Sequence, residues 1–243
     1  MKVLAFDLGG DFAHFRKFYT TSSPLTFSFP PPPTILGILG AIYGTDKNEN
    51  GHLKAFGYSQ IGLRILNPIK KVRYGLNLLE TRGKNLKLPM SDRNYQPRTQ
   101  IRTEFLKDSR YRIFVYIKDE MVLNSLIDKV KAHESVYTVS LGLSELLANF
   151  EYVNIFEGIE VNQAENDAPV DVSTPLAMNN LHPEGIIIEE GKKYYKEKLP
   201  IKMNNKRIVE IYDEVIFEPD GKTIKAKVKK YCRLENGENI TFF

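Results

Sequence analysis

Side chains able to hold a phosphate chain and to stack on flat rings gather shortly after the N-terminus. Residues 14–17 contain an arginine, a lysine and two rings, and Tyr19 and Thr20 add a third ring and a hydroxyl group. Thr34 follows a proline run at the expected start of a helix, where backbone N–H groups attract phosphate. Aromatic rings can also stack on unpaired bases. The alternative is that the rings only pack this loop onto the sheet. Composition alone favours neither RNA binding nor packing.

A second group of cations lies between Arg64 and Arg112. This stretch holds thirteen lysines and arginines, among them Arg93, Arg98 and Arg102, but only four acidic residues. Aromatic residues are interleaved with the cations, and this combination suits a groove that follows a nucleic-acid strand, because cations neutralise phosphate and rings stack on bases. We favour RNA binding for the cluster as a whole. The alternative is a solvated surface, which is the better interpretation for any single lysine.

Few residues offer acid–base chemistry. Cleavage of RNA needs groups such as His, Lys or Tyr near the scissile phosphate, and Tyr43, Lys131 and His133 are the available candidates. Lys131 and His133 lie two residues apart on an expected helix, so they would point in different directions. Serine-nucleophile motifs, P-loops and Rossmann glycine fingerprints are absent from the sequence. We therefore expect a binding protein rather than an enzyme.

Composition excludes several classes of site. Cys232 is the only cysteine and the four histidines are scattered, so we expect no disulfide, no metal site and no cofactor. The net charge of +4 permits a polyanionic partner without requiring one. Residues 1–10 lack the apolar run of a signal peptide, and the apolar patches elsewhere are too short to cross a membrane. We expect a cytoplasmic protein without membrane contact.

The first two thirds of the chain alternate between strand and helix patterns. We expect strands at residues 2–8, 58–66, 71–79, 99–106, 110–117 and 152–157, helices at 34–43 and 119–133, and a turn at Gly9 and Gly10. Val122, Leu126 and Val130 form the expected core stripe of the second helix. This order is typical of an α+β, ferredoxin-like (RRM-like) sheet with helices on one face, a common RNA-binding platform.

The last third reads as β-hairpins only. We therefore expect a ferredoxin-like RNA-binding domain at residues 1–161 and an all-β region at residues 162–243. Within the all-β region, an alternating pattern places Lys222, Lys225, Lys227, Lys229 and Lys230 around the apolar residues Ile224, Ala226 and Val228. This alternation indicates a strand with one basic face, which we interpret as a sheet edge protected by lysines.

Four segments resemble motifs of the CRISPR-associated Cas five family, in the form found in type I-B systems. Three lie near the N-terminus, at residues 6–17 (FDLGGDFAHFRK), 19–26 (YTTSSPLT) and 32–44 (PPTILGILGAIYG). Residues 141–149 (LGLSELLAN) resemble the second glycine-loop motif of that family.

The resemblance implies a repeat-associated RNA-binding fold with a thumb hairpin at about residues 81–105. It implies one copy in a Cascade surveillance complex of antiviral defence, where the protein holds the 5′ handle of the CRISPR RNA. The implied neighbours are the Cas seven backbone subunit, the Cas eight large subunit and target DNA. The residues expected to contact RNA are His14, Phe15, Arg16, Lys17, Tyr19, Thr20, Thr34, Arg93, Arg98, Arg102, Gly142 and Ser144.

One branch of the family, from type I-C systems, is a ribonuclease that uses a tyrosine, a lysine and a histidine. Tyr43 lies where that tyrosine would be, but the adjacent Lys-His pair is absent, with Lys131 and His133 as the nearest substitute. The resemblance thus implies a subunit that does not cut RNA, with a separate Cas six enzyme for processing. The alternative is a metal-independent endoribonuclease that processes precursor CRISPR RNA.

Overall fold

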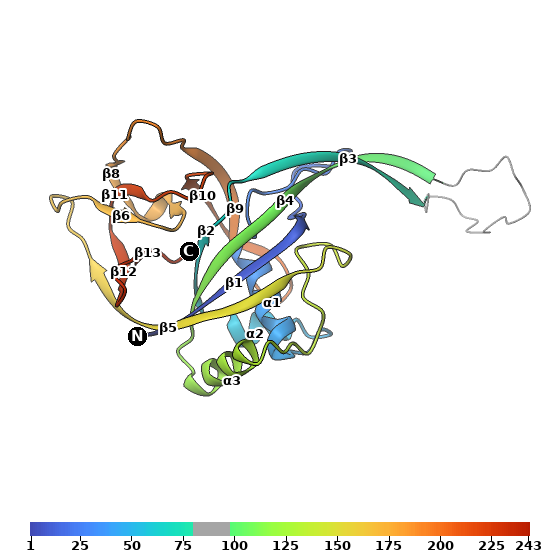
Figure 1. Ribbon diagram of the computed structural model, residues 1–243, viewed down its shortest axis with the longest axis horizontal. Coiled ribbons are helices and arrows are strands. Elements are labelled where there is room, and N and C mark those ends of the chain that lie inside the picture. The colour runs from blue at the N-terminus through green and yellow to red at the C-terminus, as the bar shows by residue number, and fades with distance from the viewer. Residues whose placement is uncertain (80–97) are drawn as a thin grey trace, which may run out of the picture.

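A computed structural model describes residues 1–79 and 98–243 (Figure 1). The protein has an α+β fold that is rich in strands and has few helices. In chain order the described elements are β1 (Lys2–Ala13), α1 (Pro32–Tyr43), α2 (Gly51–Phe56), β2 (Gln60–Ile65), β3 (Lys70–Leu79), β4 (Arg98–Tyr116), α3 (Glu120–Lys131), β5 (Asn149–Asn162), β6 (Val170–Val172), β7 (Leu176–Ala177), the 3-10 helix η1 (Met178–Asn180), β8 (Leu181–Ile186), β9 (Tyr195–Met203), β10 (Val209–Phe217), β11 (Ile224–Val228), β12 (Lys230–Leu234) and β13 (Asn239–Ile240).

The central sheet is built around β1. Its strand order is β13-β12-β5-β1-β4-β2, and β3 pairs with the outer part of β4. All of these pairings are antiparallel. Because neighbouring residues of a strand face opposite sides of a sheet, Leu4 and Phe6 join the core beneath the helices, whereas Val3 and Ala5 pack against β12 and β13. Figure 1 places α1, α2 and α3 together on one side of this sheet.

The expected turn at Gly9 and Gly10 is wrong, because β1 continues through both glycines to Ala13. Gly9 pairs with Arg110 and Gly10 with Ser109 of β4. A Cβ atom on Gly10 would lie 2.7 Å from the Leu147 carbonyl oxygen. These glycines therefore serve close approach of backbones rather than a change of direction.

The expected pair of strands at residues 99–106 and 110–117 is one strand, β4, of 19 residues. Its first part pairs with β3, its middle with β1 and its end with β2. Asp108 adopts a φ of 54°, which a hairpin turn could use. Since β1 extends past Gly10 and pairs with Lys107 as well as Ser109, the chain is held in the sheet across this position.

Helix α1 begins at Pro32, two residues before the expected start at Thr34, so two prolines lie in its first turn. It ends at Gly44, whose φ is 96° and whose N–H donates to the Gly40 carbonyl oxygen at 2.9 Å. The two glycines within α1 have different surroundings. A Cβ atom on Gly40 would lie 2.5 Å from His52 Cβ in α2, a helix that the sequence did not predict, whereas one on Gly37 would meet no atom within 4 Å.

Helix α3 is the better predicted of the long helices. The Asp119 carboxylate accepts from the backbone N–H groups of Met121 and Val122 and caps its start. Its buried stripe includes Leu126 and Val130 as expected, but Leu123 is buried where Val122 was predicted. Among residues 1–79 and 98–243, no helix has the length and apolar character needed to span a membrane.

The C-terminal third forms two three-stranded sheets, β7-β10-β9 and β6-β11-β8, and adds β12 and β13 to the central sheet. Strand β11 alternates apolar and basic residues as predicted, but it is the middle strand of its sheet rather than an edge. Leu199, Val215 and Phe217 belong to the same core cluster as the helices. The division into regions at residues 161 and 162 stays a prediction, although β5 runs continuously to Asn162.

Candidate nucleic-acid interface

Residues that lie far apart in the sequence meet around a cavity of about 360 Å³. They come from the end of β1 and the loop after it, the start of α1, the loop between α3 and β5, and the hairpin of β9 and β10. Five of the residues predicted to contact RNA line this cavity, namely His14, Phe15, Arg16, Thr34 and Gly142. The structure therefore joins three of the four motif segments, residues 6–17, 32–44 and 141–149, into one site.

The contact between His14 and Gly142 fixes segment 6–17 against segment 141–149. The His14 backbone N–H donates to the Leu141 carbonyl oxygen at 2.9 Å, and its ring Nδ1 donates to the Glu104 carbonyl oxygen at 2.7 Å. Gly142 adopts a φ of 102°, and a Cβ atom there would lie 1.9 Å from the His14 carbonyl oxygen. Only glycine can occupy this position without moving the loop.

The rings of the loop divide into buried and exposed sets. His14 and Phe15 are buried, so they form walls of the cavity rather than free stacking platforms. Phe18 and Tyr19 are more than half exposed. The ring of Phe18 lies 4.9 Å, centre to centre, from that of Tyr212 in β10. Sequence analysis missed both Phe18 and Tyr212 as wall residues, and only Phe18, an aromatic residue in a long loop, gave a signal.

Lys17 does not present a free charge. Its Nζ lies 3.1 Å from Glu197 Oε1, and both side chains are largely buried. Glu197 also accepts from Lys71 Nζ at 3.3 Å, from the Ser28 backbone N–H at 3.0 Å and from Ser28 Oγ at 2.9 Å. Burial by itself lowers the pKa of Lys17, but the contacts with Glu197 and Tyr19 outweigh it and hold that pKa above its usual value. Lys17 thus anchors the loop through Glu197, a residue that the sequence analysis did not select.

A second carboxylate ties the loop to the base of the arm formed by β3 and β4. Glu104 is buried, and its Oε1 accepts from the Thr26 backbone N–H at 3.3 Å. Its Oε2 accepts from Arg73 Nε at 3.3 Å and Nη2 at 3.2 Å. The loop is thereby fixed both to the C-terminal region and to the arm.

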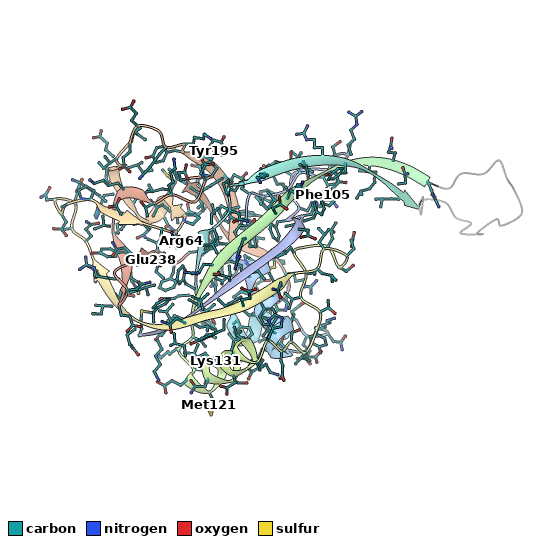
Figure 2. All side chains as sticks on the ribbon, in the orientation of Figure 1. Arg64, Phe105, Met121, Lys131, Tyr195 and Glu238 are labelled. Carbon is teal, nitrogen blue, oxygen red and sulfur yellow. The ribbon has the colours of Figure 1, made fainter. Side chains whose placement is uncertain are left out.

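Most described cations of the basic stretch are paired with acids. Arg64 Nη1 lies 2.9 Å from Glu238 Oε1, and Figure 2 shows the two residues side by side. Arg112 Nε lies 2.8 Å from Asp7 Oδ1. The stretch is thus less basic at its base than the count of charges predicts, because acids distant in the sequence neutralise part of it.

Three described cations of the stretch form no ion pair with another described residue, namely Lys107 at the base of the arm and Arg98 and Arg102 further along it. Arg98 and Arg102 of β4 are exposed and form no ion pair with any residue in the ranges 1–79 and 98–243. Arg93 lies outside the described residues, as does most of the expected thumb at residues 81–105, of which residues 98–105 belong to β4. Figure 1 shows β3 and β4 projecting beyond the body of the protein.

The remaining predicted contacts form local hydrogen bonds. The exposed Arg16 donates from Nη2 to the Thr20 carbonyl oxygen at 3.2 Å. Thr20 Oγ1 donates to the Lys17 carbonyl oxygen at 2.9 Å. Ser144 is exposed and donates from Oγ to Glu145 Oε2 at 3.3 Å.

The three catalytic candidates each contact a different ring. Tyr43 packs edge-on against Phe56, at 5.6 Å between ring centres. Lys131, on α3 in Figure 2, lies with Nζ 5.1 Å from the centre of the Tyr152 ring. His133 stacks on Phe150 at 4.9 Å. Within the described ranges, no hydrogen bond or ion pair links these three candidates. Across the same residues, no three His, Cys, Asp or Glu side chains gather as a metal site.

Comparisons with known proteins agree with the resemblance of the motifs. A crystal structure of a CRISPR protein from Archaeoglobus fulgidus has a similar fold, with a TM-score of 0.60 and 16% identity over 98% of this chain and 97% of that one. A chain of a CRISPR RNA-guided surveillance complex matches with a TM-score of 0.52 and 12% identity, over 92% and 91% of the two chains. No curated protein matches. The family model described as CRISPR-associated protein (Cas_Cas5) matches residues 3–216, so this chain belongs to the CRISPR-associated Cas five family.

Proposed function

We propose that this chain holds the 5′ handle of a CRISPR RNA as a non-catalytic subunit of a type I, I-B-like, interference complex. The observation that carries the proposal is the cavity beside the loop after β1. It unites five residues predicted from three separate family motifs, and Gly142 is fixed against His14 by a contact that no other residue type allows.

The walls of the cavity suit bases better than phosphates. Phe18 and Tyr212 supply exposed rings, whereas Lys17, the cation next to Arg16 in the loop, is already paired with Glu197. Stacking of a base on an aromatic ring contributes about 1–3 kcal/mol. Phosphates would instead follow Arg16 and the exposed cations Arg98 and Arg102 of the arm.

The fold supports the same proposal. The strand order β5-β1-β4-β2, with α1 and α3 as the connections, is the order expected for a ferredoxin-like (RRM-like) domain. The arm of β3 and β4 would form the base of the thumb. In this proposal the Cas seven backbone subunit, the Cas eight large subunit and target DNA are the neighbours of the RNA-bound protein.

The test measures binding of handle-containing RNA and assembly with the backbone subunit. Exchanging Arg98 and Arg102 together for glutamate should weaken RNA binding about tenfold or more and reduce the slope of log affinity against log salt by about 1.4–2, because two phosphate contacts are lost. The matched control exchanges Lys2 and Lys118, two exposed lysines at the opposite end of the sheet, for glutamate with the same change of charge. Assembly on RNA that is unchanged in the arginine variant would instead indicate a purely protein-binding scaffold.

The proposal that the protein does not cut RNA is tested separately. Among the described residues, Tyr43, Lys131 and His133 form no hydrogen bond with one another, an arrangement that does not favour their joint action on one phosphate. Repeat RNA incubated with excess protein in EDTA should stay intact. Cleavage that is lost when Tyr43 is exchanged for phenylalanine would establish the alternative, a metal-independent endoribonuclease for precursor CRISPR RNA.

A further inference from the structure

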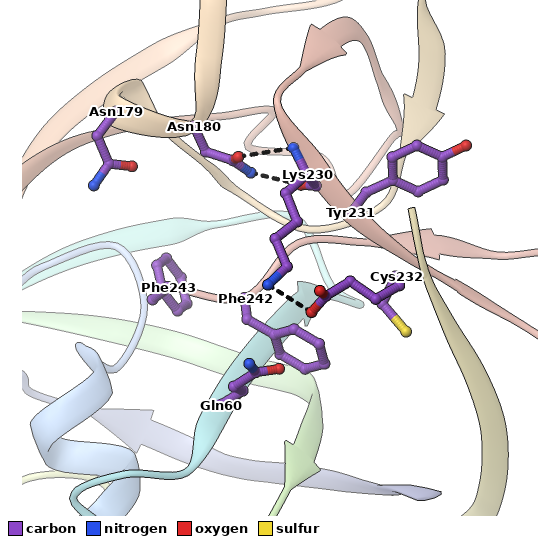
Figure 3. A pocket seen from close by; sticks show the side chains of 9 residues that line it. Gln60, Asn179, Asn180, Lys230, Tyr231, Cys232, Phe242 and Phe243 are labelled. Carbon is purple, nitrogen blue, oxygen red and sulfur yellow. Dashed lines mark hydrogen bonds and ion pairs between the residues drawn. The ribbon is translucent and has the colours of Figure 1, made fainter. Parts of the chain in front are cut away.

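A second cavity, of about 260 Å³, lies apart from the candidate interface. It shares no lining residue with the first cavity. Cys232 and Phe242 in its wall pack with Val3 and Ala5, on the face of the central sheet opposite to the helices. The lining residues, drawn in Figure 3, are Gln60, Glu160, Asn179, Asn180, Lys230, Tyr231, Cys232, Phe242 and Phe243.

The walls of this pocket are held in place by backbone contacts. Asn180 Nδ2 donates to the Lys230 carbonyl oxygen at 2.8 Å, and the Lys230 backbone N–H donates to Asn180 Oδ1 at 3.1 Å, which fixes η1 on β12. On the other side, the Phe243 backbone N–H donates to the Ile61 carbonyl oxygen at 3.0 Å. The pocket is therefore formed before any ligand arrives.

The charges of the pocket compensate each other. Lys230 Nζ lies 2.6 Å from Glu160 Oε2, and both side chains are about half exposed, so the pair lies at the rim. Among the described residues of the lining, no other side chain is charged. Burial raises the pKa of the Cys232 thiol, which keeps it protonated and unreactive. The pocket thus offers no unpaired charge to a phosphate or a carboxylate.

Two side-chain amides of the lining are unpaired. Gln60 Oε1 is buried and has no hydrogen-bond partner, and within residues 1–79 and 98–243 the side chain of Asn179 forms no hydrogen bond. Figure 3 shows Gln60 beside the ring of Phe242. Because no described residue restrains the Gln60 carbonyl oxygen, rotation of the amide can present either a donor or an acceptor to the pocket. A buried acceptor without a partner is costly, and a ligand N–H would remove that cost.

We infer that this pocket binds one unpaired, uncharged nucleobase. The rings of Phe242 and Phe243 offer flat apolar surface for a base. Side-chain amides pair well with base edges, which carry donors and acceptors side by side. The volume suits a single base or nucleoside rather than several nucleotides. The base would come either from a free nucleoside or from a nucleic-acid strand, and the inference does not depend on handle binding at the other cavity.

The test is calorimetric titration with adenosine, guanosine, cytidine and uridine, and in a second arm with a short single-stranded RNA that lacks the handle. At least one nucleoside should bind, and Gln60→Met should weaken that binding about fivefold to tenfold through loss of one hydrogen bond. Asn179→Ala, at an exposed position, should weaken it in the same direction and serves as a variant whose folding is not in question. Asn124→Leu, which removes an exposed amide from α3, away from both the pocket and the arm, is the matched control and should bind as the wild type does.

The two arms distinguish the source of the base. Nucleoside binding that depends on Gln60 supports a free ligand. If only the RNA binds and Gln60→Met weakens it, the pocket takes a base of a strand. The inference is overturned if neither probe binds, or if both bind equally well to the wild type and to the Gln60 variant. The titration can be repeated on the variant in which Arg98 and Arg102 are exchanged for glutamate, because these residues lie outside the pocket. Nucleoside binding by that variant would show that this pocket works independently of the proposed handle site.

Discussion

The close contact between Gly142 and His14 leads to a quantitative prediction. In Gly142→Ala, the new Cβ atom would start 1.9 Å from the His14 carbonyl oxygen, at a φ of 102° that side chains rarely adopt. The left-handed backbone costs about 1–2 kcal/mol, and relief of the overlap costs roughly another 1–3 kcal/mol. The free energy of unfolding should therefore fall by about 2–5 kcal/mol. For a chain of this length, that corresponds to a fall in Tm of roughly 4–20 °C.

Substitutions at two other glycines separate the backbone cost from the steric cost of Gly142→Ala. Gly191 has a φ of 76°, and a Cβ atom there would meet no atom within 4 Å, so Gly191→Ala should carry only the backbone cost, about 1–2 kcal/mol. Gly37 lies in α1 with free space around it, and Gly37→Ala should stabilise the protein by about 0.5–1 kcal/mol. Thermal unfolding followed by circular dichroism measures all three. If Gly142→Ala costs no more than Gly191→Ala, the joining of the two motifs by steric contact is refuted.

Three further predictions concern charged and catalytic candidates. Glu197→Gln leaves Lys17 without its buried partner and should lower the free energy of unfolding by about 3 kcal/mol, measured by urea unfolding. Burial tends to raise the pKa of Glu197, but Lys71 and the other contacts lower it below 4.5, so its stabilising effect is present above that value and is lost as the pH falls through the folded pKa. The Tm of the wild type should accordingly fall more steeply in acid than that of Glu197→Gln, and parallel curves would contradict this. Tyr43→Phe should leave affinity for handle RNA within about twofold of the wild type, since the ring keeps its edge contact with Phe56.

The sequence predicted those elements that are determined by residues close together in the chain. The proline run before α1 and the apolar periodicity of α3 depend only on neighbouring residues, and both helices form where they were predicted, although α1 begins two residues earlier than expected. The expected division of β4 failed because its continuity depends on β1, about a hundred residues away, which pairs across Asp108. Helix α2 was missed because only six residues form it, and it packs on Gly40 rather than showing a periodic stripe of its own.

In the candidate site, too, the sequence identified individual residues but not the contacts between distant ones. His14 and Gly142 were selected because they lie in recognisable motifs, but only the fold reveals that one touches the other. Lys17 was predicted as an RNA contact from its charge, whereas the structure pairs it with Glu197. Charge along a sequence does not reveal which cations are already neutralised by distant acids, and this limits any prediction from a basic stretch.

The C-terminal third contributes to the interface both structurally and chemically. Strand β9 supplies Glu197, which fixes the loop after β1 through Lys17 and Ser28. Strand β10 supplies Tyr212, whose ring faces Phe18 at the cavity. Since the motifs in residues 1–150 provide neither the carboxylate nor this ring, they cannot by themselves complete the anchored loop and its aromatic wall. The hairpin of β9 and β10 is therefore part of the proposed RNA site, although its own sequence carries little that identifies it.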